Sequence, residues 1–440
     1  MAGLAVLASV AAPMASASAV TPMVAAAAED AAPVTVIQET SDIRTGDVPV
    51  SQIRFTAELP AGFSGDVKAQ MVIDNTPGGG WDTPSRMISG FRNVSCLVNG
   101  VPGSPCKFFG GTTEDDDGTL YLDLPTATVV PSASGQKVTW VLRMNVADNL
   151  FGSMGGRIDL RDAAGAALAT APVKINFVEG RASYRPTFFG RDAAGVLWQY
   201  ESDGKTGSVR YAPRTRVGGG WNIYDTITRL GSSHVGSEAA PPGYGTELVA
   251  RDAAGQLWFY ERSGDPVNPF KSRKLVGGGW GQYTSIVGMG DSRRDGVSDL
   301  LARGSDGVLW FYRGTGNPDR PFKPRVKVGG GWNQYTSLTA FPNGLLAKDA
   351  AGVLWYFEAN PTGEVAAPLK PRRQIGTGFG PFTALAYAGD KNALGHDDML
   401  ARGRDGSLWL YEGAWNTKGY KLSGKRTLVG GGWNIYNTLI

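Results

Sequence analysis

Short runs in which apolar and polar residues alternate dominate the first part of the chain. Clusters of Gly, Pro and Asp separate these runs, and no amphipathic helical pattern is evident. Period-two alternation and short apolar runs are typical of β-strands. The clearest predicted strands are Val34–Ile37, Ile53–Ala57, Val67–Ile73, Lys137–Leu142 and Val173–Val178. Residues 29–180 are therefore predicted to form a β-sandwich, with an immunoglobulin-like arrangement as one option.

Beyond about residue 181 the pattern of strands and turns repeats itself. One landmark is a hairpin that ends in Leu-Trp, with its Trp at positions 198, 258, 310, 355 and 409. The second is a Gly-Gly-Gly-Trp turn followed by Tyr, with its aromatic residue at positions 221, 280, 332, 379 and 433, where position 379 holds Phe. The two series keep step at intervals of 45 to 60 residues. Units of this length with four short strands are typical of β-propeller blades.

The two ends of the repeat region predict how a propeller would close. In one complete unit the predicted strands are Tyr335–Phe341, Leu345–Lys348, Val353–Glu358 and Arg372–Ile375. The first unit starts instead at a second strand, Thr187–Arg191, whereas the chain ends on a lone first strand, Ile435–Ile440. Pairing these two segments completes one blade and covers its open edges. We therefore predict an all-β chain in which residues 181–440 form a five-bladed β-propeller closed by the C-terminal strand.

The repeated motif resembles that of a known family. Successive units read as a basic residue, Val-Gly-Gly-Gly-Trp-Asn-x-Tyr, an apolar strand, a turn with Gly, and Leu-Trp, as in Arg325–Tyr335 and Leu428–Tyr436. This pattern resembles the tachylectin family of five-bladed propeller lectins, and it is also similar to exported bacterial FG-GAP/VCBS repeat proteins. The first resemblance implies binding of N-acetylated sugars between blades. The second implies export and calcium held in Asp-rich loops.

Ligand-binding residues are predicted where two turns meet. In a four-stranded blade the turn between strands 2 and 3 and the connection from strand 4 to the next blade emerge on one face. Aromatic rings and amides in these turns suit the C–H face and the hydroxyls of a sugar. Candidates are Trp221, Asn222, Tyr224, Trp280, Gln282, Tyr283, Trp332, Asn333, Tyr335, Trp433, Asn434 and Tyr436. The alternative is that these aromatic residues fill the core, as is expected of the Leu-Trp tryptophans.

The sequence contains few candidate residues for metal binding or catalysis. Asp291, Asp295 and Asp299 are weak candidates for calcium, because Arg293 interrupts the oxygen ligands that calcium requires, and a solvated turn is the alternative. No nucleophile elbow, zinc spacing, phosphate loop or paired-acid motif appears, and only two His occur. The chain is therefore not predicted to be an enzyme, although two carboxylates of a glycoside hydrolase could still converge in the fold.

The first 28 residues and the two cysteines indicate an extracellular protein. The first 28 residues lack charge and include the small-residue pattern Ala15–Ala19, which fits a signal peptide whose start lies upstream. A membrane anchor is the alternative, but this stretch is only weakly apolar. The two cysteines, Cys96 and Cys106, are predicted to form a disulfide. Residues 181–440 carry 32 Lys and Arg against 22 Asp and Glu, a net charge of +10. This charge favours binding of anionic polymers if it forms a patch. The alternative is that the basic residues are scattered over the surface without a patch.

Together these observations predict a secreted, multivalent, lectin-like protein. Its expected partners are N-acetylated sugars or cell-surface glycans, with no nucleic acid and no membrane span in the mature form. The alternative is an extracellular adhesion or scaffold propeller that binds proteins through its variable loops. Sugar binding predicts that the Trp-Asn-x-Tyr residues are exposed, and scaffolding predicts that they are buried.

Overall fold

The computed structural model describes residues 33–45, 51–74, 90–110, 119–147, 150, 152–178, 186–230, 247–263, 268–341, 344–362, 364–392, 396–416 and 419–440. These residues form β-strands, turns and four 3₁₀ turns, and the described part contains no α-helix. The chain is all-β, as predicted. Within the described residues no helix has the length and apolar character needed to cross a membrane. The predicted signal peptide at residues 1–28 lies outside the described residues.

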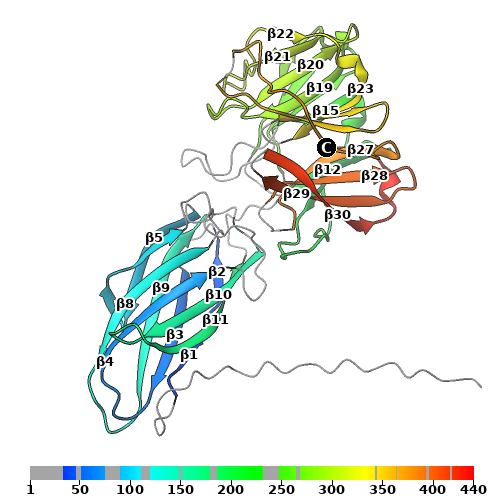
Figure 1. Ribbon diagram of the computed structural model, residues 1–440. Coiled ribbons are helices and arrows are strands. Elements are labelled where there is room, and N and C mark those ends of the chain that lie inside the picture. Colours follow the sequence, from blue (N-terminus) through cyan, green and yellow to red (C-terminus); the bar gives the residue numbers. More distant parts are fainter. Residues whose placement is uncertain are drawn as a thin grey trace, which may run out of the picture.

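Two sheets make up the N-terminal part (Figure 1). The first has the order β1-β3-β9-β5-β6 and the second β2-β11-β10-β4-β8-β7. The five runs predicted from the sequence fall within β1, β3, β4, β9 and β11 or overlap their ends. The strands are β1 (Thr35–Gln38), β2 (Asp42–Arg44), β3 (Ser51–Leu59), β4 (Gly65–Ile73), β5 (Phe91–Val98), β6 (Val101–Gly103), β7 (Lys107–Gly110), β8 (Leu120–Val129), β9 (Gln136–Val146), β10 (Gly152–Arg161) and β11 (Ala167–Val178).

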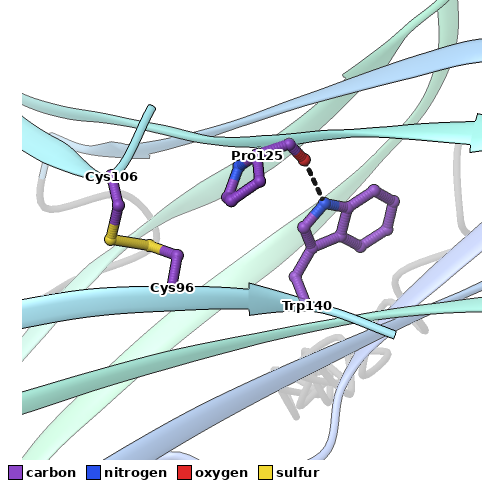
Figure 2. The surroundings of a disulfide bond; sticks show 4 residues. All are labelled: Cys96, Cys106, Pro125 and Trp140. Carbon is purple, nitrogen blue, oxygen red and sulfur yellow. Dashed lines mark hydrogen bonds between the residues drawn. A yellow bond between two sulfur atoms is a disulfide. The ribbon is translucent and has the colours of Figure 1, made fainter. Parts of the chain in front are cut away.

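One hydrophobic core joins the two N-terminal sheets. It takes alternate side chains from both sheets, including Phe55 and Trp140 from the first and Met71 from the second. Trp140 is fully buried, and its indole N–H donates a 2.8 Å hydrogen bond to the carbonyl of Pro125 (Figure 2). The predicted disulfide between Cys96 and Cys106 is present, with the two Cα atoms 5.6 Å apart. It links β5 of the first sheet to the residue that precedes β7 of the second.

Five four-stranded antiparallel sheets make up the C-terminal part. The first repeat sheet contains β31 (Tyr436–Leu439), β12 (Thr187–Asp192), β13 (Leu197–Glu201) and β14 (Thr215–Gly218). The second contains β15 (Tyr224–Arg229), β16 (Leu248–Asp252), β17 (Leu257–Tyr260) and β18 (Lys274–Gly277). The third contains β19 (Tyr283–Gly290), β20 (Asp299–Gly304), β21 (Leu309–Tyr312) and β22 (Val326–Gly329). The fourth contains β23 (Tyr335–Phe341), β24 (Gly344–Asp349), β25 (Leu354–Glu358) and β26 (Arg373–Gly376). The fifth contains β27 (Phe382–Gly389), β28 (Asp398–Gly403), β29 (Leu408–Asn416) and β30 (Gly419–Gly430).

The last strand of the chain belongs to the first repeat sheet. β31 pairs with β12 in antiparallel register, with Gly190 opposite Leu439. Ile440 and Phe189 extend the pairing, because each donates its backbone N–H to the carbonyl of the other, at 2.9 and 3.0 Å. The predicted pairing of the C-terminal strand with Thr187–Arg191 is therefore present, and the C-terminus lies beside β12 (Figure 1).

Five apolar clusters fill the space between neighbouring repeat sheets. Each cluster takes its buried side chains mainly from two sheets. Together they join the second to the third, the third to the fourth, the fourth to the fifth, the fifth to the first, and the first to the second. The last of these contains Ile440 together with Phe189 of β12 and Tyr224 of β15. The final residue of the chain therefore contributes to the contact between the first two sheets.

We expect deletion of residues 436–440 to destabilise the C-terminal sheets strongly. It removes β31 and leaves the N–H and C=O groups of β12 without their partners, and an open strand edge favours aggregation. Differential scanning calorimetry should show a lower Tm and a less cooperative transition. Asn437→Ala is the matched control, because it removes one side chain that accepts a 3.0 Å bond from Arg191 and leaves the strand in place. A deletion variant that melts like the intact chain would contradict the structural role of this pair.

Candidate functional site

A basic side chain on the second strand of each repeat sheet binds the backbone of the following sheet. Arg303 of β20 is representative: its Nη1 donates to the carbonyls of Trp332 at 3.0 Å and Tyr335 at 2.7 Å. We call this contact the clasp. The equivalent donors are Arg191 to Trp221 and Tyr224, Arg251 to Trp280 and Tyr283, Lys348 to Phe382, and Arg402 to Trp433 and Tyr436.

The two predicted turns meet at these junctions. The backbone N–H of Trp332 donates a 3.0 Å bond to the carbonyl of Gly307, in the turn between β20 and β21. The other four junctions repeat this bond, with Gly195, Gly255, Gly352 and Gly406 as acceptors. Gly307 has a φ of +76°, and an added Cβ would lie 3.1 Å from the side chain of Asn333. Glycine is therefore required both by the turn and by the close approach of the next sheet.

The predicted aromatic ligand residues lie in the core. Trp221, Trp280 and Trp332 are buried, and Trp433 is half-buried. Each of these indoles packs on an aromatic ring of the third strand of its own sheet, as Trp332 does on Phe357 at 4.8 Å between centroids. Phe379 packs on Tyr411 in the same way, which explains why Phe can replace Trp there. Tyr224, Tyr283, Tyr335 and Tyr436 are also buried. The exposure that sugar binding predicted for these rings is therefore not observed.

The predicted amides are exposed but already make contacts. Asn333 donates a 3.0 Å bond to the carbonyl of Ser305, and Asn434 donates a 3.1 Å bond to the carbonyl of Arg404. Gln282 donates a 2.7 Å bond to the carbonyl of Gly279. Asn222 is exposed at the corresponding position of the first junction. Asn333 and Asn434 thus connect the turns of neighbouring sheets, whereas Gln282 bonds within its own turn.

The Leu-Trp tryptophans, expected to be core, are only half-buried, and an exposed Arg covers each of them. In the third repeat sheet the guanidinium carbon of Arg325 lies 4.1 Å from the ring centroid of Trp310. We call such a pair an Arg–Trp station. The other stations are Arg214 on Trp198, Arg273 on Trp258, Arg372 on Trp355 and Arg426 on Trp409. Sequence reasoning missed these arginines, although an Arg three positions before each Val-Gly or Ile-Gly was visible as part of the repeat.

A tyrosine hydroxyl holds each of these guanidinium groups in place. Arg325 donates through Nη1 to the hydroxyl of Tyr283 and, at 3.0 Å, to the side-chain oxygen of Gln282. Arg372 repeats both contacts with Tyr335 at 2.5 Å and Gln334 at 3.0 Å. The remaining stations use Tyr436, Tyr224 and Tyr411. The stations are thus five similar arrangements of an exposed cation on a half-buried aromatic ring.

The weak calcium candidates do not converge on a common point. Asp291 accepts from the backbone N–H of Asp295 at 2.8 Å and of Gly296 at 3.0 Å. Asp295 forms a 2.7 Å ion pair with Arg313. Asp299 is buried and accepts from the backbone N–H of Gly314 at 2.8 Å. In the described ranges no group of three or more His, Cys, Asp or Glu side chains could hold a metal ion.

Asp299 and Asp398 perform the same structural task in the third and fifth repeat sheets. Asp299 accepts from the Ser292 hydroxyl and from Gly314, while Asp398 accepts from the backbone N–H groups of Lys391 and Gly413, both at 3.1 Å. Burial raises the pKa of Asp299 to about 6, and it raises the pKa of Asp398 well above its ordinary value. Both carboxyl groups therefore hold the loop between strands 1 and 2 to the end of strand 3.

Comparison with known proteins assigns no family. No family model matches the chain, and no curated protein matches it. Among solved structures, a putative 6-phosphogluconolactonase from Bacteroides fragilis is 11% identical, with 77% of this chain and 96% of that chain covered and a TM-score of 0.28. Human WBSCR16 is 10% identical over 78% and 89%, with a TM-score of 0.24. A chain of the complex of Kap60 with yeast RCC1 (Prp20) is 10% identical, with 80% of this chain and 80% of that chain covered and a TM-score of 0.26.

We expect Arg303→Ala to weaken the junction between the third and fourth repeat sheets. The change leaves the carbonyls of Trp332 and Tyr335 without their charged donor, at a cost of roughly 2–4 kcal/mol. Arg303→Lys should cost less, because Lys348 makes a clasp with a single 2.7 Å bond to Phe382 in the next sheet. Urea denaturation followed by circular dichroism measures both effects. Equal midpoints for the wild type and the Ala variant would show that the clasp contributes nothing.

We expect Asp299→Asn to change how stability depends on pH. The pKa of Asp299 is about 6 in the folded chain and about 4 in an unfolded chain. The folded state therefore binds more protons between these values, and its free energy of unfolding falls as the pH rises from 4 to 6. Asn keeps an acceptor for Gly314 but cannot ionise. The variant should be more stable than the wild type by about 2 kcal/mol at pH 7.5 and similar to it near pH 4.

Chemical denaturation at pH 4 and pH 7.5 tests the role of Asp299. Asp306→Asn, on an exposed turn of the same sheet, controls for the loss of one negative charge. An Asp299→Asn variant that is less stable than the wild type at pH 7.5 would overturn the assignment.

Proposed function

We propose that the chain consists of an N-terminal β-sandwich followed by a closed five-bladed β-propeller. Two features support this architecture. The two N-terminal sheets share one core, and each of the five repeat sheets contacts the next through an apolar cluster and a clasp. The pairing of β31 with β12 is what a ring closed by both ends of the repeat region requires.

We propose that this propeller is a secreted, multivalent glycan-binding protein. The observation that carries the proposal is the fivefold repetition of the Arg–Trp station. Each station offers guanidinium N–H donors, and Gln282 or Gln334 adds an amide at two of them. Such groups pair with the hydroxyl, acetamide or acidic groups of a sugar. The proposed glycan site is therefore the exposed Arg–Trp station, and not the Trp-Asn-x-Tyr rings that the sequence analysis predicted.

Repetition matters because each station is small. An exposed guanidinium beside one amide contributes only a few hydrogen bonds, so a single station should bind a monosaccharide weakly. Linked weak sites can exceed the affinity of one site by roughly 10²–10⁴ when the target presents ligands at matching spacing. A polysaccharide or a dense cell-surface glycan provides such a target. The Cys96–Cys106 disulfide supports an extracellular location, where disulfides persist.

A protein-binding scaffold is the second candidate, and a specific observation favours it. Burial of Trp221, Trp280 and Trp332 removes the aromatic platforms on which sugars usually stack. The accessible face of each Leu-Trp indole is also partly covered by its Arg, as at Trp310. A scaffold would use the loops between strands 1 and 2 and between strands 3 and 4, which vary in length from sheet to sheet.

Glycan-array binding of the full chain distinguishes the two candidates. We expect binding to multivalent displays and a stepwise loss as stations are changed, first Arg372→Gln, then Arg273→Gln and Arg214→Gln in the same chain. These arginines are exposed, so each change should lower Tm by no more than a few degrees. Asn437→Ala, outside the stations, is the control for array binding. Absence of binding to every glycan would overturn the glycan proposal in favour of the scaffold.

A further inference from the structure

Two neighbouring Arg–Trp stations are nearly identical in geometry but differ in charge. Arg325 and Arg372 lie 4.1 and 4.2 Å from their tryptophan centroids, and each donates to one tyrosine hydroxyl and one glutamine. Beside Arg372, the indole N–H of Trp355 donates a 2.9 Å bond to Asp349. That bond and the charge of Arg372 lower the pKa of Asp349. A carboxylate therefore offsets the guanidinium at this station.

The Arg325 station holds its acid in another way. The carboxylate of Asp306 lies 2.5 Å from the place of a Cβ on Gly304, and it accepts from the backbone N–H of Val308 at 3.0 Å. Gly304 occupies the place in the turn that Asp349 occupies in the next sheet. In addition, Lys327 lies directly opposite Trp310 in the strand register, where the next sheet has Gln374 opposite Trp355. Lys327 is exposed. The third repeat sheet thus has two exposed cations at its tryptophan, Arg325 stacked on the ring and Lys327 opposite it in the register. The fourth sheet has Arg372 alone.

The hydrogen bonds of Arg325 leave its planar fork open. Both of its side-chain contacts, to Gln282 and Tyr283, use Nη1. Among the described residues no hydrogen bond of ordinary geometry uses Nε or Nη2, although the Tyr312 hydroxyl also interacts with this guanidinium. These two nitrogens carry the parallel N–H groups that bind two oxygens of a carboxylate or sulfate at once. The stack on Trp310 and the bonds of Nη1 fix the orientation of this fork, which reduces the conformational entropy lost on binding.

We propose that the station formed by Arg325, Trp310 and Lys327 is a subsite for an acidic group of a glycan, a sulfate or a uronate carboxylate. The fork of Arg325 binds two oxygens of the acidic group, and Lys327 supplies a second positive charge. This inference rests on the proposed glycan binding and names the class of glycan. It predicts that the five stations are not equivalent. Neutral sugars can use all of them, whereas acidic groups prefer a station with a second cation opposite its tryptophan, which is Lys327 in the third repeat sheet and Arg216 in the first.

The test measures binding of two acidic probes to the full chain by surface plasmon resonance. Immobilised heparin oligosaccharide presents sulfates and polygalacturonate presents carboxylates, with N-acetylchitooligosaccharide as the neutral comparison. We expect Arg325→Gln to weaken binding to one or both acidic probes about tenfold, as loss of a charge-assisted hydrogen bond does. Arg372→Gln removes the same side chain from the matched station. It should weaken binding of the neutral probe as Arg325→Gln does, but it should weaken acidic binding clearly less. Arg325→Lys should also lose affinity, because lysine keeps the charge without the fork.

A second pair of variants tests the contribution of charge at the strand register. Lys327→Gln gives the third sheet the residue of the fourth and should weaken acidic binding several-fold. Gln374→Lys makes the reverse change and should strengthen it. Both positions are on outermost strands and exposed. Calorimetry should therefore show a Tm close to that of the wild type for both variants.

The outcomes separate this inference from the proposed function. If the chain binds neutral glycans, and Arg325→Gln and Arg372→Gln weaken binding of the acidic probes equally, the acidic subsite is overturned while glycan binding stands. Full affinity in Arg325→Lys would overturn the role of the fork. Duplex DNA that competes as well as free heparin would show a general polyanion surface and overturn the assignment to glycans. Absence of binding to all three glycan probes would overturn the proposed function itself.

Discussion

A basic side chain that donates to backbone carbonyls of the neighbouring sheet is the interaction on which the repeat region depends. The Gly-Trp turn ends a sheet-to-sheet connection, and its carbonyls point into a junction that apolar side chains fill. Buried carbonyls need donors. Arg303 supplies one charged donor to two of them, at 3.0 and 2.7 Å. The same clasp recurs at every junction, so the spacing of the sheets follows from one repeated contact.

The clasp also explains which aromatic residues are available for binding. The clasp holds the Trp-x-x-Tyr turn against the preceding sheet. In this position Trp332 packs on Phe357 and is buried. The tryptophan of the third strand lies farther out, and Arg325 covers the exposed part of Trp310. The surface of the junction is therefore made of guanidinium groups and amides. Recognition through such a surface depends on hydrogen bonds and charge more than on stacking.

Sequence reasoning located the strands and turns but reversed the two tryptophan classes. Strands such as Tyr335–Phe341 were predictable because turn glycines and alternating apolar residues mark their ends. The pairing of β31 with β12 was predictable because one strand was missing at the start and one was left over at the end. Burial of Trp332 was not, since a large aromatic residue after a glycine turn suits a core and a binding site equally. The role of Arg325 required knowing that its side chain folds back over Trp310 on the adjacent strand.

The pairing of β31 with β12 has a consequence for the order of events during synthesis. Arg191 and Thr438, which face each other in this pair, are 247 residues apart in the chain. A ribosome therefore releases β12 long before its partner strand exists, and the first repeat sheet waits with an unpaired edge while the other four can assemble. Long-range pairing of this kind is slow and exposes the chain to misassociation. Completion of the first sheet is thus a late step, which follows synthesis of the four sheets that lie between its two strands in the chain.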